Sequence, residues 1–353
     1  MSQNKNHHFV PQFYLREFSV SENRKQIGVF NIETEVFVQA GNIKFQASKK
    51  NYYGKDSKLE KELARIEGFI ATSLAEIIKA KDLPRRNTDS HFNLLAFVVL
   101  SFLRTTVNEN TLNESTDQMI KKIYGKDPNF KDEIDDWYFG FQNSSVFGVT
   151  LMADILPASL DLNYKLLIND TSKPFITSDN PVVKYNLLLE QKNIRGGIVG
   201  LGTIGLKIFL PLTPKLMVLF YDADSYSVGV VGSSTFLLKQ ESAVNDLNML
   251  QILNCEKIVF FNHQCTETYI RHLNTKSKPF ERANRSIVSE HRLIDKFGND
   301  LPESILHSRT TECRVGLQLP FIKISAKGRK YKPTTMAHIR PFIKKLIDAG
   351  SLQ

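Results

Sequence analysis

The stretch that most constrains how this chain can fold is Lys173–Lys184, which reads KPFITSDNPVVK. After Lys173 and Pro174, an apolar pair (Phe175 and Ile176) precedes a Thr-Ser-Asp-Asn-Pro turn, and two valines follow the turn. Pro181 fixes its own φ and keeps Asn180 out of the helical region, and Asp and Asn side chains close turns by accepting nearby backbone N–H groups. The pattern predicts a strand, a polar turn and a second strand, with the Asp179 carboxylate at a strand end. Active sites and ordinary structural corners are both built in this way, so both interpretations stay open.

The length and composition are those of a soluble globular protein. The chain has 353 residues, enough for one large domain or two ordinary ones, and 42% are apolar and 24% charged. No apolar run approaches the length of a membrane-spanning helix, and the first twelve residues lack the apolar centre of a signal peptide. Three cysteines (Cys255, Cys265 and Cys313) are too few and odd in number for a disulfide scaffold, so we expect a cytoplasmic protein without a membrane partner.

The net charge of +9 permits a polyanionic partner without demanding one. The excess is concentrated near the C-terminus, where eight cations follow one another: Lys323, Lys327, Arg329, Lys330, Lys332, Arg340, Lys344 and Lys345. Such a cluster is either a patch that follows nucleic-acid phosphates or a plain solvated face.

The order of the predicted elements indicates an α+β fold. Apolar residues repeat at helical spacing over residues 59–80, and the helix over 89–104 is apolar on nearly all sides. Residues 26–39 read as a hairpin, and from Tyr164 onward short β-rich runs alternate with turn signals. Helices first and strands later predict a helical N-terminal half packed on a mostly antiparallel β-sheet. We expect residues 1–273 to form this domain and residues 274–353 to form a basic extension packed on the same unit.

His7 and His8 lie beside the apolar entry to a short helix. A histidine in this position can act as a general base, a metal ligand or a proton shuttle. Adjacent side chains in an extended stretch point in opposite directions, so we expect only His8 to act in catalysis, with His7 in substrate binding. The structural alternative is that one histidine is solvated and the other packs at the domain edge.

Arg104 is the lone charge at the end of an apolar helix. A guanidinium there can bind a phosphate through two N–H groups, or it can form a buried ion pair with Glu67 or Asp179. Glu67 itself is a candidate substrate-binding residue, with a solvated surface glutamate as the alternative.

Asp179 is the strongest candidate for chemistry. A carboxylate flanked by Ser178 and Asn180 can act as a base or hold a metal such as Mg²⁺ or Mn²⁺, with its two neighbours binding substrate. The alternative is a turn in which backbone N–H groups satisfy the carboxylate. We hypothesise that Asp179, His8 and Arg104 converge on one pocket.

Three other patterns lack the context that their chemistry needs. The glycines at 200, 202 and 205 match a dinucleotide fingerprint by letters, but Pro211 prevents the helix that must follow. Glu190-Gln191-Lys192 after Asp179 matches a nuclease spacing that is common by chance. The Cys and His residues near 255–265 lack the paired short spacings of a zinc site.

Five stretches, in this order, resemble the bacterial DUF4238 family. They are HHFVPQFYLREFS at residues 7–19, the helix carrying LE and IE at 59–60 and 66–67, FLRT at 102–105, PFITSDNPVV at 174–183 and FLPLTP at 209–214. The likeness extends to about Phe261, and Tyr164 stands where family members often carry Trp. The resemblance implies a single-gene anti-phage defence protein with a phage-encoded trigger, and it implies no mechanism.

These observations lead to a nuclease acting on RNA or DNA as the first functional hypothesis. His8 would move the proton, Asp179 would hold a metal or orient the substrate, and Arg104 would bind phosphate. The alternatives are a non-enzymatic sensor that recognises a phage component and a nucleotide-modifying toxin.

Overall fold

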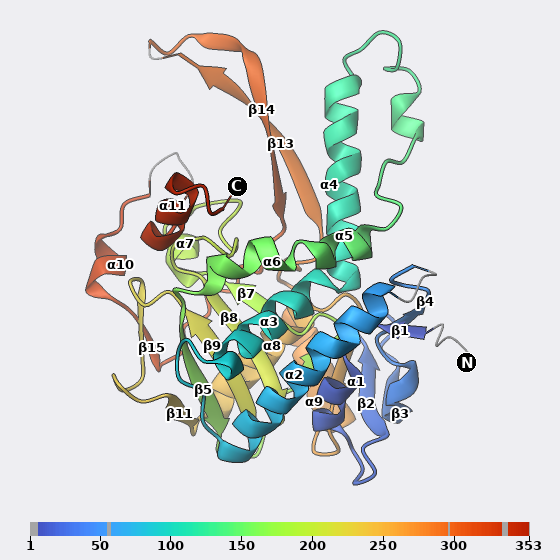
Figure 1. Ribbon diagram of the computed structural model, residues 1–353, viewed down its shortest axis with the longest axis vertical. Coiled ribbons are helices and arrows are strands. Elements are labelled where there is room, and N and C mark those ends of the chain that lie inside the picture. The colour runs from blue at the N-terminus through green and yellow to red at the C-terminus, as the bar shows by residue number, and fades with distance from the viewer. Residues whose placement is uncertain (1–5, 55–57, 296, 334–337, 353) are drawn as a thin grey trace.

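A five-stranded sheet forms the centre of the computed structural model, which describes residues 6–54, 58–295, 297–333 and 338–352 (Figure 1). Its strands follow the order β11, β5, β9, β8 and β7. All neighbours are antiparallel except β11 and β5, which are parallel. The bounds are β5 Asn163–Asn169, β7 Val183–Tyr185, β8 Lys207–Thr213, β9 Leu216–Tyr221 and β11 Thr235–Leu238.

Both faces of this sheet are buried. Ile208, Val218 and Phe220 point to one face, where they pack with the helices α2 (Lys58–Ala80) and α3 (Asp89–Leu103). Phe209 and Leu219 alternate with them and pack on the other face, against α8 (Glu241–Asn254). Since successive side chains of a strand point to opposite faces, a sheet covered on both sides needs nearly continuous apolar strands, as β8 and β9 are.

The two helices predicted most directly from apolar spacing are present. The amphipathic pattern forms α2, and the run that is apolar on all sides forms α3, whose N-terminus is capped by Thr88. Ten of the fifteen residues of α3 are buried, which explains why no polar face was visible in its sequence.

A second, four-stranded sheet joins distant parts of the chain. Its order is β3 (Phe37–Asn42), β2 (Gln26–Asn31), β12 (Ile258–Phe261) and β6 (Thr177–Ser178), all antiparallel. The helix α9 (Glu267–Ser277) packs on it. Gly28 of β2 lies opposite Phe261 on the neighbouring strand β12, and any Cβ at position 28 would collide with the Phe261 ring.

A long arm projects from the body (Figure 1). It consists of α4 (Thr106–Tyr124) with the loop 125–143, and of the hairpin β13 (Ser286–Ile294) and β14 (Asp300–Thr310). Gln118 of α4 joins the two parts, because its side chain donates to the Ser286 carbonyl and accepts from the Val288 N–H. We refer to residues 106–143 and 286–310 as the arm.

Shorter elements complete the chain around these units. They are β1 Asn6–His8, α1 Gln12–Leu15, β4 Ser48–Lys50, α5 Ser144–Thr150, α6 Met152–Ile155, α7 Leu187–Gln191, β10 Tyr226–Val228, β15 Ile322–Ile324, α10 Ala326–Lys330 and α11 Pro341–Asp348. Among the described residues no single helix has the length and apolar composition to cross a membrane; α3 and α4 reach both only as a pair bent by 55°.

The predicted α+β arrangement, with a helical N-terminal half packed on one sheet, is wrong. Helices and strands of this mixed structure occur throughout the chain, and four strands precede α2. The N-terminal hairpin was visible locally, but its Phe30 is buried in an apolar cluster with Val259 and Phe261 of β12, a strand that lies more than 200 residues later and pairs with β2. Its place in a second sheet therefore depends on a contact that no local pattern encodes.

Candidate functional site

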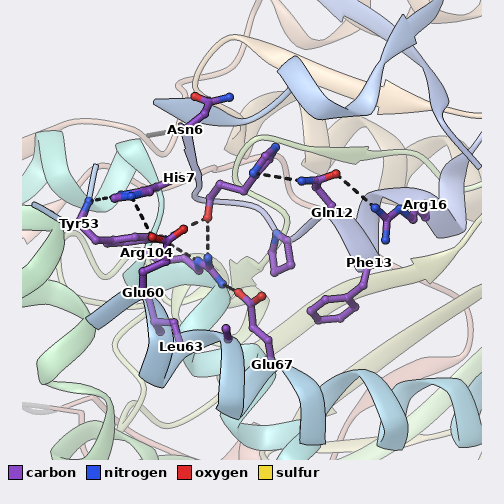
Figure 2. Close-up of a pocket in the computed structure, with 13 residues that line it drawn as sticks. Asn6, His7, Gln12, Phe13, Arg16, Tyr53, Glu60, Leu63, Glu67 and Arg104 are labelled. Atoms are coloured by element: carbon purple, nitrogen blue, oxygen red, sulfur yellow. Dashed lines mark hydrogen bonds and ion pairs between the residues drawn. The ribbon is translucent and has the colours of Figure 1, made fainter. Parts of the chain in front are cut away.

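A pocket of about 300 Å³ opens where β1, α1, α2 and the C-terminal end of α3 meet (Figure 2). It brings together two histidines, two arginines and two glutamates from segments that are distant in sequence. Its lining residues are Asn6, His7, His8, Pro11, Gln12, Phe13, Arg16, Tyr53, Glu60, Leu63, Ala64, Glu67 and Arg104.

Each ring nitrogen of His8 has one hydrogen-bond partner in the protein. Its Nε2 lies 3.1 Å from the Lys44 carbonyl oxygen, which only accepts, so Nε2 carries the proton. Nδ1 is then the acceptor and lies 3.4 Å from the Gln12 amide nitrogen. Burial lowers the pKa of His8 below 6.5, and the charges of Arg104 and Arg16 lower it further, against the opposing effects of the Lys44 carbonyl and Glu67. His8 is therefore equipped to accept a proton at neutral pH.

His7 has the opposite surroundings. Its Nδ1 accepts the Tyr53 backbone N–H at 3.0 Å, so its Nε2 carries the proton and lies 3.2 Å from the Glu60 carboxylate. The ring stacks on Tyr53 at a centroid distance of 5.7 Å. With both nitrogens occupied inside the protein, His7 fixes the wall of the pocket.

Arg104 is the buried cation behind the pocket, with 3% of its surface exposed. It forms an ion pair with Glu67, donates Nη2–H to the His8 carbonyl at 2.5 Å and donates Nε–H to the Tyr53 hydroxyl at 3.0 Å. These bonds tie β1 to α2 and hold His8 in place. Of the two ion pairs considered from the sequence, the structure contains the one with Glu67.

Arg16 is the cation at the pocket that remains available. It is exposed, and its only side-chain partner among the described residues is the Gln12 amide oxygen, at 3.3 Å from Nη2 (Figure 2). Gln12 thus bridges Arg16 and His8. A guanidinium at this point can bind an anion without first breaking an ion pair.

The SDNP turn has a different position. Asp179 does not line the pocket, and its carboxylate accepts the backbone N–H groups of Glu256 at 2.8 Å and of Lys257 and Ile258 at 2.9 Å. Burial raises the pKa of Asp179 to about 6, although these three donors oppose the shift. The carboxylate is ionised above this pH and joins the turn to the start of β12.

The neighbours of Asp179 are equally engaged. The Ser178 hydroxyl donates to Gln251 at 3.0 Å, and the Asn180 amide donates to the Asn254 carbonyl at 2.8 Å. Asn180 also accepts from Thr105 at 3.3 Å, so the turn packs against the residue that follows Arg104. Asn180 lines a separate space of about 60 Å³ beside Lys184.

Three buried amides of α8 hold this turn, and none of them was predicted as functional from the sequence. Asn248 bonds the Ile176 N–H and the Pro174 carbonyl, Gln251 bonds the Pro181 carbonyl, and Asn254 bonds the carbonyls of Asn180 and Val182. The signal was available, because amides recur every third residue at positions 248, 251 and 254, and the other residues between 247 and 253 are apolar.

The structure therefore divides the predicted site residues into two groups. His7, His8, Glu67 and Arg104 meet at the pocket, whereas Ser178, Asp179 and Asn180 lie in a buried turn outside it. The residues that sequence reasoning missed are Gln12, Arg16, Tyr53 and Glu60. Two spacings could have indicated them: Gln12 and Arg16 follow His8 at intervals of four, and Glu60 precedes Glu67 by seven on one helix face.

The donor set of the pocket suits proton transfer and anion binding. No three His, Cys, Asp or Glu side chains in the described part of the chain are grouped so that they could hold a metal ion. The pocket offers instead one imidazole acceptor and one accessible guanidinium.

Comparison with known proteins gives one match. No curated protein and no solved structure matches this chain. A family model described as "Protein of unknown function (DUF4238)" matches residues 6–264, which include the pocket, the SDNP turn and β12. The extent of that match shows that the chain belongs to the DUF4238 family.

Proposed function

We propose that this protein is an anti-phage defence nuclease that cleaves RNA in the pocket around His8. The defence role rests on what the family resemblance implies. The observation that supports the chemistry is the surroundings of His8. Its Nδ1 is an acceptor at the pocket, and the Gln12 side chain joins it to the Arg16 guanidinium, which has no ion-pair partner among the described residues. A general base beside an anion-binding cation is the minimum that phosphodiester cleavage by an internal nucleophile requires.

In the proposed reaction His8 Nδ1 accepts the proton of a ribose 2′-hydroxyl. The 2′-oxygen forms a bond to phosphorus, the bond from phosphorus to the 5′-oxygen breaks, and the leaving 5′-oxygen takes a proton from water. The hydroxide formed in this way takes the proton from His8, which returns to its neutral form. The products are a 2′,3′-cyclic phosphate and a 5′-hydroxyl. Arg16 binds the phosphate. Arg104 positions His8 by donating a hydrogen bond to the His8 backbone carbonyl. Asp179 has a structural role in this proposal.

RNA is preferred to DNA because of the donor set. DNA has no 2′-hydroxyl, so its hydrolysis needs an activated water, for which paired metal ions are a common solution. The pocket offers a base and cations, and among the described residues no cluster of metal ligands accompanies them. The sequence also suggested Mg²⁺ or Mn²⁺ as a cofactor, so the cleavage assay is carried out both with and without these ions.

The test incubates purified protein with tRNA, single-stranded RNA, plasmid and single-stranded DNA, in EDTA or with Mg²⁺ or Mn²⁺. Wild type is expected to cleave RNA in EDTA and to leave a 2′,3′-cyclic phosphate. His8→Asn is expected to lose about 100- to 10,000-fold in rate. Arg16→Ala is expected to lose about 10- to 100-fold, with partial recovery in Arg16→Lys.

The matched control is His272→Asn, because His272 is an exposed histidine on α9, outside the lining of the pocket. It should cleave at the wild-type rate. An RNA with a single 2′-deoxy position should resist cleavage at that position. Wild-type rates in His8→Asn with an intact fold, or cleavage of DNA that requires a metal, would contradict the proposal.

A specific observation favours the second candidate, a non-enzymatic sensor that binds a phage component. Arg104 and the whole SDNP turn, which carry family motifs, are engaged inside the protein. In this second candidate, the family motifs maintain the fold and take no part in catalysis. Absence of cleavage under every condition, with defence retained in His8→Asn cells, would favour this candidate.

A further inference from the structure

The arm exposes an unusual share of the molecule's apolar surface. Nineteen large apolar side chains are exposed among the described residues, and nine belong to the arm, which is less than a fifth of the chain: Ile123, Tyr124, Phe130, Trp137, Tyr138, Phe141, Phe297, Leu301 and Ile305. Exposed apolar residues that are concentrated in this way mark interaction surfaces.

Aromatic rings form the centre of this surface. Tyr124, Phe130, Trp137 and Phe139 contact one another edge to face in sequence, at centroid distances of 6.0, 6.4 and 6.1 Å. Trp137 is 45% exposed and Tyr138 is 70% exposed. We refer to residues 124–141 as the aromatic loop. Its rings are ordered by contact with each other, so their outward faces are available to a partner at little entropic cost.

The aromatic loop is also acidic, in a chain whose net charge is +9. Asp132, Glu133, Asp135 and Asp136 are all exposed, and none has an ion-pair partner among the described residues. Carboxylates repel nucleic acid and anionic membranes, whereas aromatic faces and carboxylates together attract Lys and Arg side chains. The chemistry of the surface therefore selects a cationic protein segment.

The same chain carries such a segment. Residues 323–345 contain eight Lys and Arg residues and no Asp or Glu. Lys323, Arg329, Lys330, Lys332, Lys344 and Lys345 are exposed and have no ion-pair partner among the described residues. We refer to the described residues 323–333 and 338–345 as the basic segment. Within one molecule, no ion pair or hydrogen bond of the described residues joins it to the aromatic loop.

We propose that two copies of this chain associate, with the aromatic loop of each copy bound to the basic segment of the other. Reciprocal exchange of this kind closes a two-fold dimer and satisfies both unpaired surfaces at once. Arg329 and Lys330 supply cations for the ring faces and for Asp135 and Asp136. This inference goes beyond the proposed function and does not depend on it.

The test measures self-association by sedimentation equilibrium on protein freed of nucleic acid, since bound RNA could bridge two molecules. Wild type is expected to dimerise, with a Kd that rises at least about tenfold between low and high salt. A loop variant, Asp135→Lys with Asp136→Lys, and a segment variant, Arg329→Glu with Lys330→Glu, should each be monomeric. An equimolar mixture of the two should form dimers again, because both reciprocal contacts regain opposite charges.

The matched control for the loop variant is Glu22→Lys with Glu76→Lys, two exposed acids outside the arm that give the same change of net charge as that variant. It should dimerise like wild type. Trp137→Ser should weaken the dimer without changing its salt dependence. A monomeric wild type at low salt, or a mixture that stays monomeric, would overturn the inference. The outcome is independent of RNA cleavage, which the monomeric variants would still perform if the proposed function holds.

Discussion

At the scale of single residues, the surroundings of His8 set the pH range of the proposed reaction. Because its folded pKa lies below 6.5, cleavage should be independent of pH near neutrality and fall as pH drops through that pKa. Arg16 is one of the charges that lower this pKa, so Arg16→Ala should move the acidic limb to higher pH as well as reduce the rate. A rate profile from pH 4.5 to 8.5 measures both effects. An acidic limb above pH 7 in wild type would contradict the assignment of His8 as the base.

Lys207 is a buried cation that the sequence analysis did not single out. It is 0% exposed, its Nζ has no hydrogen-bond partner in the described part of the chain, and the ammonium lies 5.0 and 4.7 Å from the ring centroids of Tyr185 and Tyr226. Burial lowers its pKa to about 7, against the attraction of Glu190. The unfolded chain therefore binds one more proton between about pH 7 and 10.5, and the stability contribution of this residue rises with pH across that window.

Lys207→Met should therefore stabilise the fold at pH 7, by roughly 2–4 kcal/mol, and by much less at pH 9.5. Urea denaturation at the two pH values measures the difference. The exposed Lys239, directly after β11, provides the control, since Lys239→Met should change neither value by more than about 0.5 kcal/mol. Equal effects of Lys207→Met at both pH values would show that its charge is not the cause.

At the scale of elements, the SDNP turn acts as a joint between β6, β12 and α8. Asp179→Asn turns one oxygen into an N–H donor that faces a backbone N–H, because both carboxylate oxygens accept backbone donors. We expect a loss of about 2 kcal/mol in the free energy of unfolding and no loss of cleavage per folded molecule. Chemical denaturation and single-turnover cleavage measure the two quantities.

The exposed Asp170 is the matched control for this substitution, and Asp170→Asn should change stability by only a few tenths of a kcal/mol. If Asp179→Asn kept full stability and lost cleavage, Asp179 would be catalytic after all. The contrast separates the two interpretations that its sequence context left open.

The turn also shows how far local patterns reach. The residues KPFITSDNPVVK predicted a polar turn between two strands, and β6 and β7 are those strands, but β6 is formed by Thr177 and Ser178, which the prediction placed in the turn. They did not reveal that α8 would supply amides at 248, 251 and 254 to bond this backbone. An amide that points into a core is informative only when the backbone it meets is known.

At the scale of the whole molecule, Arg340 fastens the C-terminal segment to the body. It is 1% exposed, and its guanidinium donates to Asp161 at 2.8 Å and to the carbonyls of Ala158 and Leu201 at 2.6 Å. Arg340→Met leaves a carboxylate and these carbonyls without their donor. We expect a loss of about 3 kcal/mol, with residues 338–351 the first to exchange amide hydrogens.

Hydrogen–deuterium exchange resolved by peptide measures this effect. Peptides of β5, β8 and β9 in the same variant are the internal reference and should keep wild-type protection, because they belong to the central sheet. Wild-type protection of residues 338–351 in Arg340→Met would mean that the apolar side of α11 alone holds the segment.

The sequence by itself determined the elements whose signal lies within a few residues. The apolar spacing of α2, the apolar run of α3, the strands β5, β7, β8 and β9 and the family motifs are all local patterns, because backbone periodicity fixes which neighbours share a face. Only the tertiary structure decided which polar groups meet. Arg104 finds Glu67 and His8 because α3 ends beside α2 and β1, and Asp179 finds three N–H groups because β12 begins beside β6. Whether a charged residue faces a pocket or a backbone donor depends on contacts across 37 to 96 positions of chain, which no local periodicity can encode.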